Sequence, residues 1–591
     1  MKPAAVAAAC LALALLSFFQ FPGHTWLQQD TQIYAPILER LENPAALRND
    51  MLTARPHVAY TLYDEAALAL RAATRLDFRH VLELEQIAAR AFGIWGLYLC
   101  ALCLLRRGAG FQPAMPAFLQ AFLSLFLAAI CSLGATIVGP AVLTVEYEPT
   151  PRAFALPLLI CAVGLTAHRR YLGAGLAGAA AFLFHAPTAL PFWGLYLLLL
   201  LWGRLETRVG LSTRPEPPVN SPRAAVAGAP SGPRAGCHPA PQRMPKRAPL
   251  VGLLPMLAAI PILAFAAHRQ ASGEAHEFFA RLTPFVEQVQ RMRSSYNWIS
   301  TWPSEVILHY AIVFAVLLAA YARLRREIEM ELRVFLLGLP ALGMLSMPAS
   351  WLLLEHWRWA LVPELQPMRG LMFVTLFMVL LAASAAVRAA TAGRPFEAAA
   401  WFALAYLPAL QPVFTQSYAL RTLAVTVGLA ALAWLAIRLS ASRGGVSLAL
   451  GLAAFFVIPG IGGVVNYPAP HTPELAQLSA WARASTPPDA VFLFADAGRS
   501  PDSGIFRAEA VRAIYVDWKS GGQANYLPGF AEQWWFRWQQ TNANRFKPAM
   551  LPKYAALGVQ YVVLQPKNRL PQAAVFENGK YVAYALGAGS R

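Results

Sequence analysis

Residues 21–50 read FPGHTWLQQDTQIYAPILERLENPAALRND, and this stretch decides how the rest of the chain is organised. It follows directly on an apolar run and begins a long polar loop, residues 22–90, in which Asp30 is the first acidic residue. Apolar side chains after Asp30 fall on one side of a helix, at Tyr34, Ile37, Leu38 and Leu41. Such a helix is expected to lie along a bilayer surface with its apolar side down. We therefore expect Asp30 at the boundary between water and lipid.

The composition is that of a polytopic membrane protein. Of 591 residues, 57% are hydrophobic and 14% are charged, and many apolar runs are about 18 to 22 residues long, enough to cross a bilayer. We expect about thirteen spans, namely residues 4–21, 91–106, 117–138, 152–167, 172–187, 188–203, 250–267, 305–322, 333–354, 368–388, 396–412, 419–438 and 446–465. Residues 1–21 resemble a signal peptide but lack a small-x-small cleavage site after the apolar core, so we expect an uncleaved first span.

The net charge of +18 is explained by membrane orientation. With a cytoplasmic N-terminus every inner loop is basic, as orientation in a membrane requires, so we expect no nucleic-acid partner. These loops carry Arg106, Arg107, Arg169, Arg170, Arg323, Arg325, Arg326, Arg388, Arg394, Arg438 and Arg443. An odd number of spans then places residues 466–591 outside, on the same face as the loop at 22–90.

The chain divides by composition into four parts, the last of which is the expected external region 466–591. Residues 1–203 and 250–465 form two transmembrane modules. Between them, residues 204–249 are rich in proline and basic residues and lack apolar periodicity, which predicts a disordered cytoplasmic linker. The six cysteines indicate neither a disulfide framework nor a zinc site.

Both expected external parts contain regular structure. Two helices are predicted in the first loop, at 58–76 and 77–92, the second capped by Asp77. In residues 466–591, strands alternate with helices and a hairpin is expected across Asn578 and Gly579, which predicts a small α/β domain.

Two groups of residues in this tail could have a functional role. The aromatic helix containing QWWFRW, residues 533–538, could stack on sugars, but membrane anchoring is favoured. Four charged residues flank the strand IYVDW and could bind an acceptor, although a solvated strand edge is favoured for each: Arg507, Arg512, Asp517 and Lys519.

Polar residues collect at the outer ends of the spans. They are Asp30, Asp50, Glu146, Glu148, Arg152, His185, Glu355, Arg358, Glu364 and Arg369. A charge at membrane depth costs about 2.5 to 3.5 kcal/mol, so a group of them on one face is a functional hypothesis. The structural alternative is simple ion pairing, for example between Glu148 and Arg152.

Four strings in this set resemble the GT-C superfamily of polyprenyl-phosphate-dependent integral-membrane glycosyltransferases: DTQIY, VEYEPTPRAFALP, FLFHAPTALPF and PELQPMRGLMF. The plan is similar to that of oligosaccharyltransferase catalytic subunits and protein mannosyltransferase-like bacterial membrane proteins. The resemblance implies an α-helical polytopic membrane protein with a C-terminal extracytoplasmic α/β domain, in the inner membrane of a bacterium. It also implies sugar transfer from a polyprenyl-phosphate-linked donor to a glycan, lipid or protein acceptor of the cell envelope.

The resemblance also implies roles for individual residues. Asp30 matches the first-loop acid, a base or an acceptor-positioning carboxylate, and Glu146 or Glu148 matches the second acid, with Glu148 preferred because it precedes the PTPR turn. Cations that hold the lipid phosphate are matched by Arg369 and Arg152, and contacts with substrate are expected at Tyr34, His185 and Glu146.

The sequence also departs from the family pattern. QWWFRW is not the WWDYG signature of oligosaccharyltransferases, so asparagine glycosylation is not expected. The chain has no DxD pair, which leaves a requirement for Mg²⁺ or Mn²⁺ open. Two other classes remain as alternatives, a transporter or flippase of a lipid-linked or anionic solute and a non-catalytic envelope-assembly protein. The first would place charges inside the spans and show repeat symmetry, and the second would tolerate substitution of Asp30 and Glu148.

Overall fold

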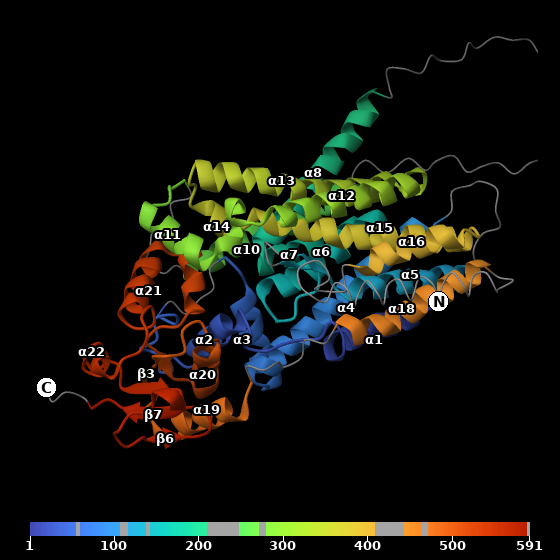
Figure 1. Ribbon diagram of the computed structural model, residues 1–591. Coiled ribbons are helices and arrows are strands. Elements are labelled where there is room, and N and C mark those ends of the chain that lie inside the picture. Colours follow the sequence, from blue (N-terminus) through green and yellow to red (C-terminus); the bar gives the residue numbers. More distant parts are fainter. Residues whose placement is uncertain are drawn as a thin grey trace, which may run out of the picture.

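Apolar helices form a bundle, and a region of mixed helices and strands covers one end of it (Figure 1). The computed structural model describes residues 1–54, 60–106, 116–137, 142–209, 248–270, 279–407, 443–462 and 471–587. The N-terminus lies at the end of the bundle away from the mixed region, and the last described strand, β7 (Val582–Ala585), lies within that region (Figure 1).

Helices occupy twelve of the thirteen ranges expected to span the membrane. They are α1 (Pro3–Phe19), α4 (Phe78–Leu105), α5 (Ala117–Ser132), α6 (Pro151–Ala167), α7 (Tyr171–Phe184), α8 (Ala186–Val209), α10 (Leu253–Gln270), α12 (Ser304–Leu324), α13 (Met330–Ser350), α15 (Leu371–Thr391), α16 (Pro395–Tyr406) and α18 (Arg443–Gly462). The remaining range, 419–438, lies outside the described residues. Five described helices are long and apolar enough to cross a membrane, and six shorter ones are apolar. The chain is therefore a multi-pass membrane protein, while the count of thirteen spans stays a prediction.

The centre of the bundle is α15, which is apolar on all sides. Nearly all of its residues are buried, and it packs against α12, α13, α16 and α5. A helix that is hydrophobic all round has no face suited to water, so it takes the interior position.

Arginines from three loops expected on the inner side meet at one end of the bundle. Arg388 donates to the carbonyl oxygen of Arg106 at 2.9 Å. Arg106 and Arg169 each lie 3.7 Å from the carboxylate of Glu329. These three arginines therefore lie on one side of the molecule, as the orientation argument expects.

The backbones of α4 and α6 approach closely at glycines. A Cβ at Gly96 would lie 2.5 Å from the backbone of Cys161, and one at Gly164 would lie 2.6 Å from the carbonyl oxygen of Gly96. Small residues permit this packing, which is typical of helices that associate within membranes.

Replacing Gly96 with alanine is therefore expected to destabilise the protein by about 1 to 3 kcal/mol, the usual result of overpacking against backbone. The apparent unfolding temperature of the purified protein in detergent measures this loss. Gly194→Ala in α8 is the matched control, because nothing lies within 4 Å of a Cβ there. If both variants unfold at the wild-type temperature, the close contact of α4 with α6 does not contribute as described.

The first loop forms the helices that were expected, although α3 is shorter than predicted and α4 continues beyond residue 92. They are α2 (Thr31–Glu42), α3 (Tyr63–Thr74) and the first turns of α4. Asp77 caps α4 as predicted, since its carboxylate accepts from the backbone N–H of His80 at 2.9 Å.

The expectation that the apolar side of α2 faces lipid is wrong. Leu38 is fully buried in one apolar cluster with Leu475 and Ile505, far along the chain. Ile37 is buried with Ile33 and Leu52. An apolar helix side predicts burial but does not distinguish lipid from protein, and here protein covers it.

The mixed region, residues 473–585, is built on a five-stranded sheet and is called the α/β region below. Its strand order is β4-β3-β5-β7-β6, with β3 parallel to β4 and β5 and the other pairs antiparallel. The strands are β3 (Val491–Phe494), β4 (Ala513–Ile514), β5 (Tyr561–Leu564), β6 (Phe576–Glu577) and β7 (Val582–Ala585). Its helices are α19 (Pro473–Ser485), α20 (Asp502–Ala510), α21 (Pro528–Gln540) and α22 (Leu551–Ala556). The hairpin predicted across Asn578 and Gly579 is confirmed by β6 and β7.

The aromatic helix α21 turns two of its three tryptophans toward the protein interior. Trp534 and Trp538 are buried in the core of the α/β region, whereas Phe536 is 61% exposed. The favoured interpretation of this helix as an aromatic membrane anchor is therefore wrong for Trp534 and Trp538. They are spaced four residues apart and so lie on the inner side of the helix.

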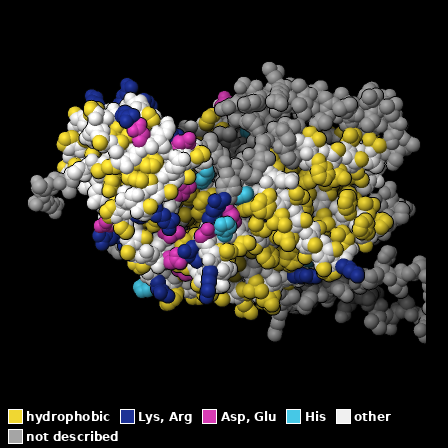
Figure 2. All heavy atoms as spheres, turned by 90° about the horizontal axis from the view of Figure 1, so that it is seen from below, with side chains coloured by type: hydrophobic (Ala, Val, Ile, Leu, Met, Phe, Trp, Pro, Cys, Tyr) yellow, Lys and Arg dark blue, Asp and Glu magenta, His cyan; other side chains and the backbone are white. Residues whose placement is uncertain are grey.

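Charge and apolar surface are separated on the molecule. Hydrophobic side chains cover the bundle on the face shown in Figure 2, while Lys, Arg, Asp and Glu concentrate toward the α/β region and its junction with the bundle. This pattern suits a bundle that contacts lipid and a region that contacts water.

Candidate active site

Asp30 lies where the first loop meets the α/β region. It immediately precedes α2, and its Oδ1 accepts from the Nζ of Lys519 at 2.6 Å. About a third of its side chain, 34%, stays exposed. Burial by itself raises the pKa of Asp30, but Lys519, followed by Arg152 and Arg369, lowers it, and the result is well below the usual 3.8. Asp30 is therefore a charged carboxylate that still has an accessible side.

Glu148 holds the turn that presents Asp30. Its Oε1 accepts the backbone N–H groups of Gln28 and Gln29 at 2.7 and 2.6 Å, and its Oε2 accepts that of Thr31 at 3.1 Å. Burial and the charge of Asp30 raise the pKa of Glu148. Since both oxygens bind backbone donors, this geometry favours a positioning role over proton transfer.

Arg152 pairs with Glu146 and not with Glu148. Its Nε lies 2.6 Å from Glu146 Oε1, and both side chains are nearly buried. Arg152 stands in the first turn of α6, where its charge also acts on Asp30 and Tyr34. The sequence left open whether Glu146 or Glu148 is the second acid of the site. In the structure, Glu146 pairs with Arg152, and Glu148 binds the backbone around Asp30.

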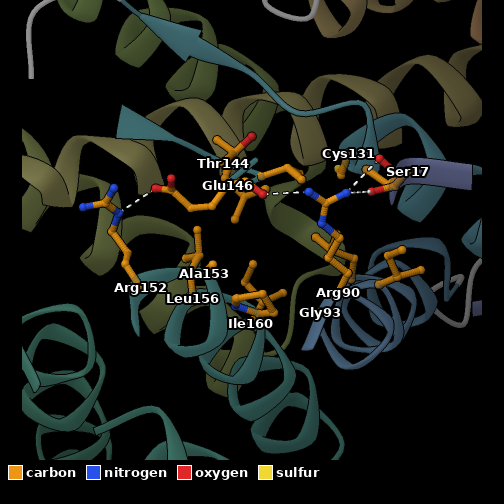
Figure 3. Close-up of a pocket in the computed structure, with 16 residues that line it drawn as sticks. Ser17, Arg90, Gly93, Cys131, Thr144, Glu146, Arg152, Ala153, Leu156 and Ile160 are labelled. Atoms are coloured by element: carbon orange, nitrogen blue, oxygen red, sulfur yellow. Dashed lines mark hydrogen bonds and ion pairs between the residues drawn. The ribbon is translucent and has the colours of Figure 1, made fainter. Parts of the chain in front are cut away.

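A small cavity lies beside the ion pair of Glu146 with Arg152. Its volume is about 40 Å³, and residues of α4 and α6 line it (Figure 3). Arg90 lines it and donates to Ser17 O and Glu146 O, both at 2.7 Å (Figure 3). The same guanidinium donates to Gly23 O at 2.9 Å. A cavity of this size holds a few water molecules but not a sugar. Arg90 therefore fastens the segment that carries Glu146, and its place at the end of the polar loop 22–90 gave no sign of that role.

Arg369 offers an unused donor to the site. It lies in the short 3-10 turn η5 (Pro367–Gly370), and its Nε donates to Gln366 Oε1. Its guanidinium lies 5.5 Å from the ring centroid of Tyr296. Arg369 Nη1 is buried and has no hydrogen-bond acceptor among the described residues. Because a buried charged donor without a partner is costly, this atom points to an anionic ligand.

Gln366 connects Arg369 to the α/β region. Its Nε2 donates to the Tyr526 hydroxyl at 3.1 Å. Its backbone has φ 46°, in the left-handed region that costs a non-glycine residue about 1 to 2 kcal/mol. This conformation ends α14 (Leu361–Leu365) and turns the chain into η5.

Tyr34 and His185 lie in the same neighbourhood. Burial, followed by the charges of Asp30 and Tyr526, raises the pKa of Tyr34 well above 10. His185 Nδ1 accepts from the Thr188 N–H at 3.2 Å and so caps the start of α8. Its ring also experiences the charges of Arg152 and Arg369. Both residues remain candidates for substrate contact.

Other polar residues expected at this face lie elsewhere. Glu355 lies 3.8 Å from Arg291, and Arg358 pairs with Glu287 at 3.1 Å. Asp50 is buried with Arg507 inside the junction of the first loop with the α/β region. These residues have structural partners, in line with the ion-pair alternative.

The favoured interpretation of Arg507 and Lys519 as a solvated strand edge is wrong. Arg507 is fully buried, and Lys519 reaches Asp30 across 489 residues of sequence. Tyr526 and Gln366 were not candidates on sequence grounds, and Lys519 was considered only as a possible acceptor contact, because their roles come from contacts between distant segments. Among the described residues no group of three or more His, Cys, Asp or Glu side chains could hold a metal ion.

Comparison with known proteins gives three findings. A family described as a domain of unknown function, DUF6798, matches residues 473–541, which contain Lys519 and Tyr526. No curated protein matches the sequence. The fold is similar to two crystal structures of ArnT from Cupriavidus metallidurans, one in the apo state and one bound to undecaprenyl phosphate. They share 11% and 12% identity with this chain, with TM-scores of 0.45 and 0.43, and each match covers 99% of this chain and 98% of the other.

Proposed function

We propose that this chain is an integral-membrane glycosyltransferase of GT-C type. It transfers a sugar from a polyprenyl-phosphate-linked donor to an acceptor outside the cytoplasm, at the outer face of a bacterial inner membrane. The N-terminus is cytoplasmic, and the α/β region is extracytoplasmic. The separation of the arginine-rich end of the bundle from the α/β region supports this orientation.

The proposal depends on one observation: the candidate site combines a negatively charged carboxylate, Asp30, with positively charged guanidinium groups. Asp30 is an ionised carboxylate with an accessible side, and Arg369 has a buried donor without an acceptor among the described residues. The charges of Arg152 and Arg369 both lower the pKa of Asp30. A charged carboxylate together with a guanidinium that has an unpaired donor suits transfer from a phosphate-linked sugar.

The chemistry divides between these groups. Asp30 accepts a hydrogen bond from the attacking acceptor group, orients it toward the anomeric carbon and takes up its proton as the bond from the acceptor to that carbon forms. The bond from that carbon to the phosphate oxygen breaks, and the lipid phosphate leaves with the added negative charge. The guanidinium groups of Arg369 and Arg152 stabilise it by charge-assisted hydrogen bonds. Tyr34, His185 and Glu146 line the space around the sugar, and Glu148 holds the Asp30 turn.

Replacing Arg369 with alanine is expected to weaken binding of undecaprenyl phosphate about 10- to 100-fold, because hydrogen bonds to a charged group contribute about 1.5 to 3 kcal/mol. The full chain in lipid nanodiscs is titrated with undecaprenyl phosphate, and tryptophan fluorescence reports binding. Undecaprenol, which lacks the phosphate, should bind the wild type and Arg369→Ala equally.

Arg358→Ala is the matched control, since this arginine is half exposed and pairs with Glu287. It should bind undecaprenyl phosphate as the wild type does. A wild type that binds the phosphate and the alcohol with the same affinity would remove the proposed donor class. Release of undecaprenyl phosphate from a panel of undecaprenyl-phosphate sugars, followed by mass spectrometry, then identifies the sugar.

A further inference from the structure

The segment between β4 and α21, residues 517–526, enters the candidate site from the α/β region. It is called the bridging loop below. It leaves the carboxyl end of β4, a strand parallel to β3, and ligand sites in such sheets lie at that edge. At its start, Lys519 binds Asp30 at 2.6 Å.

Hydrogen bonds fix the start of the bridging loop. The carbonyl oxygen of Asp517 accepts from Trp534 Nε1 at 2.8 Å and from Ser520 Oγ at 3.0 Å. The next two carbonyl oxygens accept from one arginine of α11 (Pro284–Arg293), since Arg293 donates to Trp518 O at 2.8 Å and to Lys519 O at 3.1 Å. Three successive carbonyl groups are thus bound, so the position of Lys519 is determined by the fold and not by the pairing with Asp30 alone.

The side chain of Asp517 adds a second attachment. It accepts from Arg507 at 3.0 and 3.3 Å, and both side chains are buried. Arg507 also donates to the carbonyl oxygen of Gln32 in α2, two residues after Asp30. The loop that carries Lys519 is therefore fastened to the helix that follows Asp30.

The far end of the bridging loop reaches the other half of the site. The Tyr526 hydroxyl accepts from Gln366 Nε2 at 3.1 Å, and the amide oxygen of the same Gln366 accepts from Arg369. Tyr526 thus fixes which way the Gln366 amide points. The orientation of that amide in turn fixes the guanidinium of Arg369.

We infer that the bridging loop is a built part of the active site, in which Lys519 positions Asp30 and Tyr526, through Gln366, positions Arg369. Both are positioning residues. One loop of the α/β region thereby fixes the positions of Asp30, which contacts the acceptor, and of Arg369, which contacts the lipid phosphate. This inference rests on the proposed function and extends it, because it assigns the α/β region a part in the reaction centre.

The first experiment measures coupling between Lys519 and Asp30 without any ligand. The apparent unfolding temperature is determined at pH 7.5 for the wild type, Lys519→Met, Asp30→Asn and the double variant. The two single losses should not add, because residues that interact directly show non-additive effects. Lys519→Arg, which retains the charge, should restore most of the coupling. Additive losses would overturn the Lys519 half of the inference.

The second experiment measures the effect of Tyr526 on donor binding. Tyr526→Phe removes only a hydroxyl, and we expect it to weaken undecaprenyl phosphate binding about tenfold, the equivalent of one hydrogen bond, with undecaprenol binding unchanged. Tyr561→Phe, in β5 of the same region, is the control and should bind undecaprenyl phosphate normally. A purely structural role of Tyr526 would weaken both lipids equally or neither, and either result overturns the Arg369 half.

The two experiments separate failure of the inference from failure of the proposed function. If the wild type binds undecaprenyl phosphate no better than undecaprenol, the proposed function fails, and the thermal cycle still decides whether Lys519 is coupled to Asp30. If the wild type selects the phosphate but the cycle is additive and Tyr526→Phe binds normally, the inference fails and the proposed function stands.

Discussion

Replacing Asp30 with asparagine is expected to lower the rate of sugar transfer roughly 10²- to 10⁴-fold, the range that a positioned carboxylate supplies. The amide keeps the shape of the side chain but loses the charge that the acceptor group meets. Stability should change by less than about 1 kcal/mol, because the pair with Lys519 is partly exposed and such pairs contribute little. The measurement is the initial rate of undecaprenyl phosphate release in nanodiscs, with the unfolding temperature recorded in parallel.

The control for this variant is Asp489→Asn, a carboxylate of the α/β region that pairs with Arg48 at the surface. It should retain the wild-type rate. Normal turnover by Asp30→Asn would remove Asp30 from its role, and a large fall in unfolding temperature would assign its effect to folding.

The same carboxylate sets an expectation for the pH dependence of transfer. Its pKa lies well below 3.8, so it stays charged as the pH falls from 8 to 5, and Asp30 contributes no loss of rate in this window. The charged and titratable groups whose charges couple to that of Asp30 are Lys519, Arg152, Arg369, Glu148, Tyr34, Tyr526 and Arg293. A fall in rate between pH 8 and 5 that Asp30→Asn abolishes would contradict this assignment.

Replacing Arg507 with methionine is expected to destabilise the protein by about 3 to 5 kcal/mol, the cost of leaving buried charges without their partner. Arg507 is fully buried, and its Nη1 lies 3.0 Å from Asp517 and 3.7 Å from Asp50. Methionine fills most of the space but leaves two buried carboxyl groups facing one another. The apparent unfolding temperature in detergent measures the loss.

Arg569→Met provides the comparison, because this arginine is 61% exposed and pairs with Glu577 at the surface. Its unfolding temperature should stay close to that of the wild type, as is usual for surface substitutions. If Arg507→Met were as stable as Arg569→Met, the buried triad would not hold the first loop to the α/β region.

The sequence predicted the elements of this fold better than their contacts. Apolar runs of spanning length located helices at twelve of thirteen ranges, since burial in lipid or in a bundle needs the same apolar composition. The cap at Asp77 and the hairpin at Asn578 were predictable because their hydrogen bonds are local. The surroundings of the apolar side of α2 were not predictable, because apolar periodicity does not show whether lipid or protein covers that side.

The candidate site was predictable in part, for the same reason. Asp30, Glu148, Arg152 and Arg369 were selected because a charge beside an apolar run is unusual. Lys519 and Tyr526 stand in an ordinary polar segment of the α/β region, and their importance arises from contacts 489 and 160 residues away along the chain. The pairing of Glu148 with the amides of residues 28–31 could not be read from the sequence either, since any acidic residue nearby could serve.

The hydrogen bonds that the backbone amides around Asp30 donate to Glu148 couple the position of Asp30 to that of α6. Glu148 lies three residues before α6, and the first turn of α6 carries Arg152. The Asp30 carboxylate, which Glu148 holds through the neighbouring amides, and the Arg152 guanidinium are therefore both positioned by this end of α6. A displacement of α6 along its axis would carry both charges together and preserve their separation. Lys519 belongs to the bridging loop and not to α6. A movement of α6 relative to the bridging loop would therefore change the distance between Lys519 and Asp30.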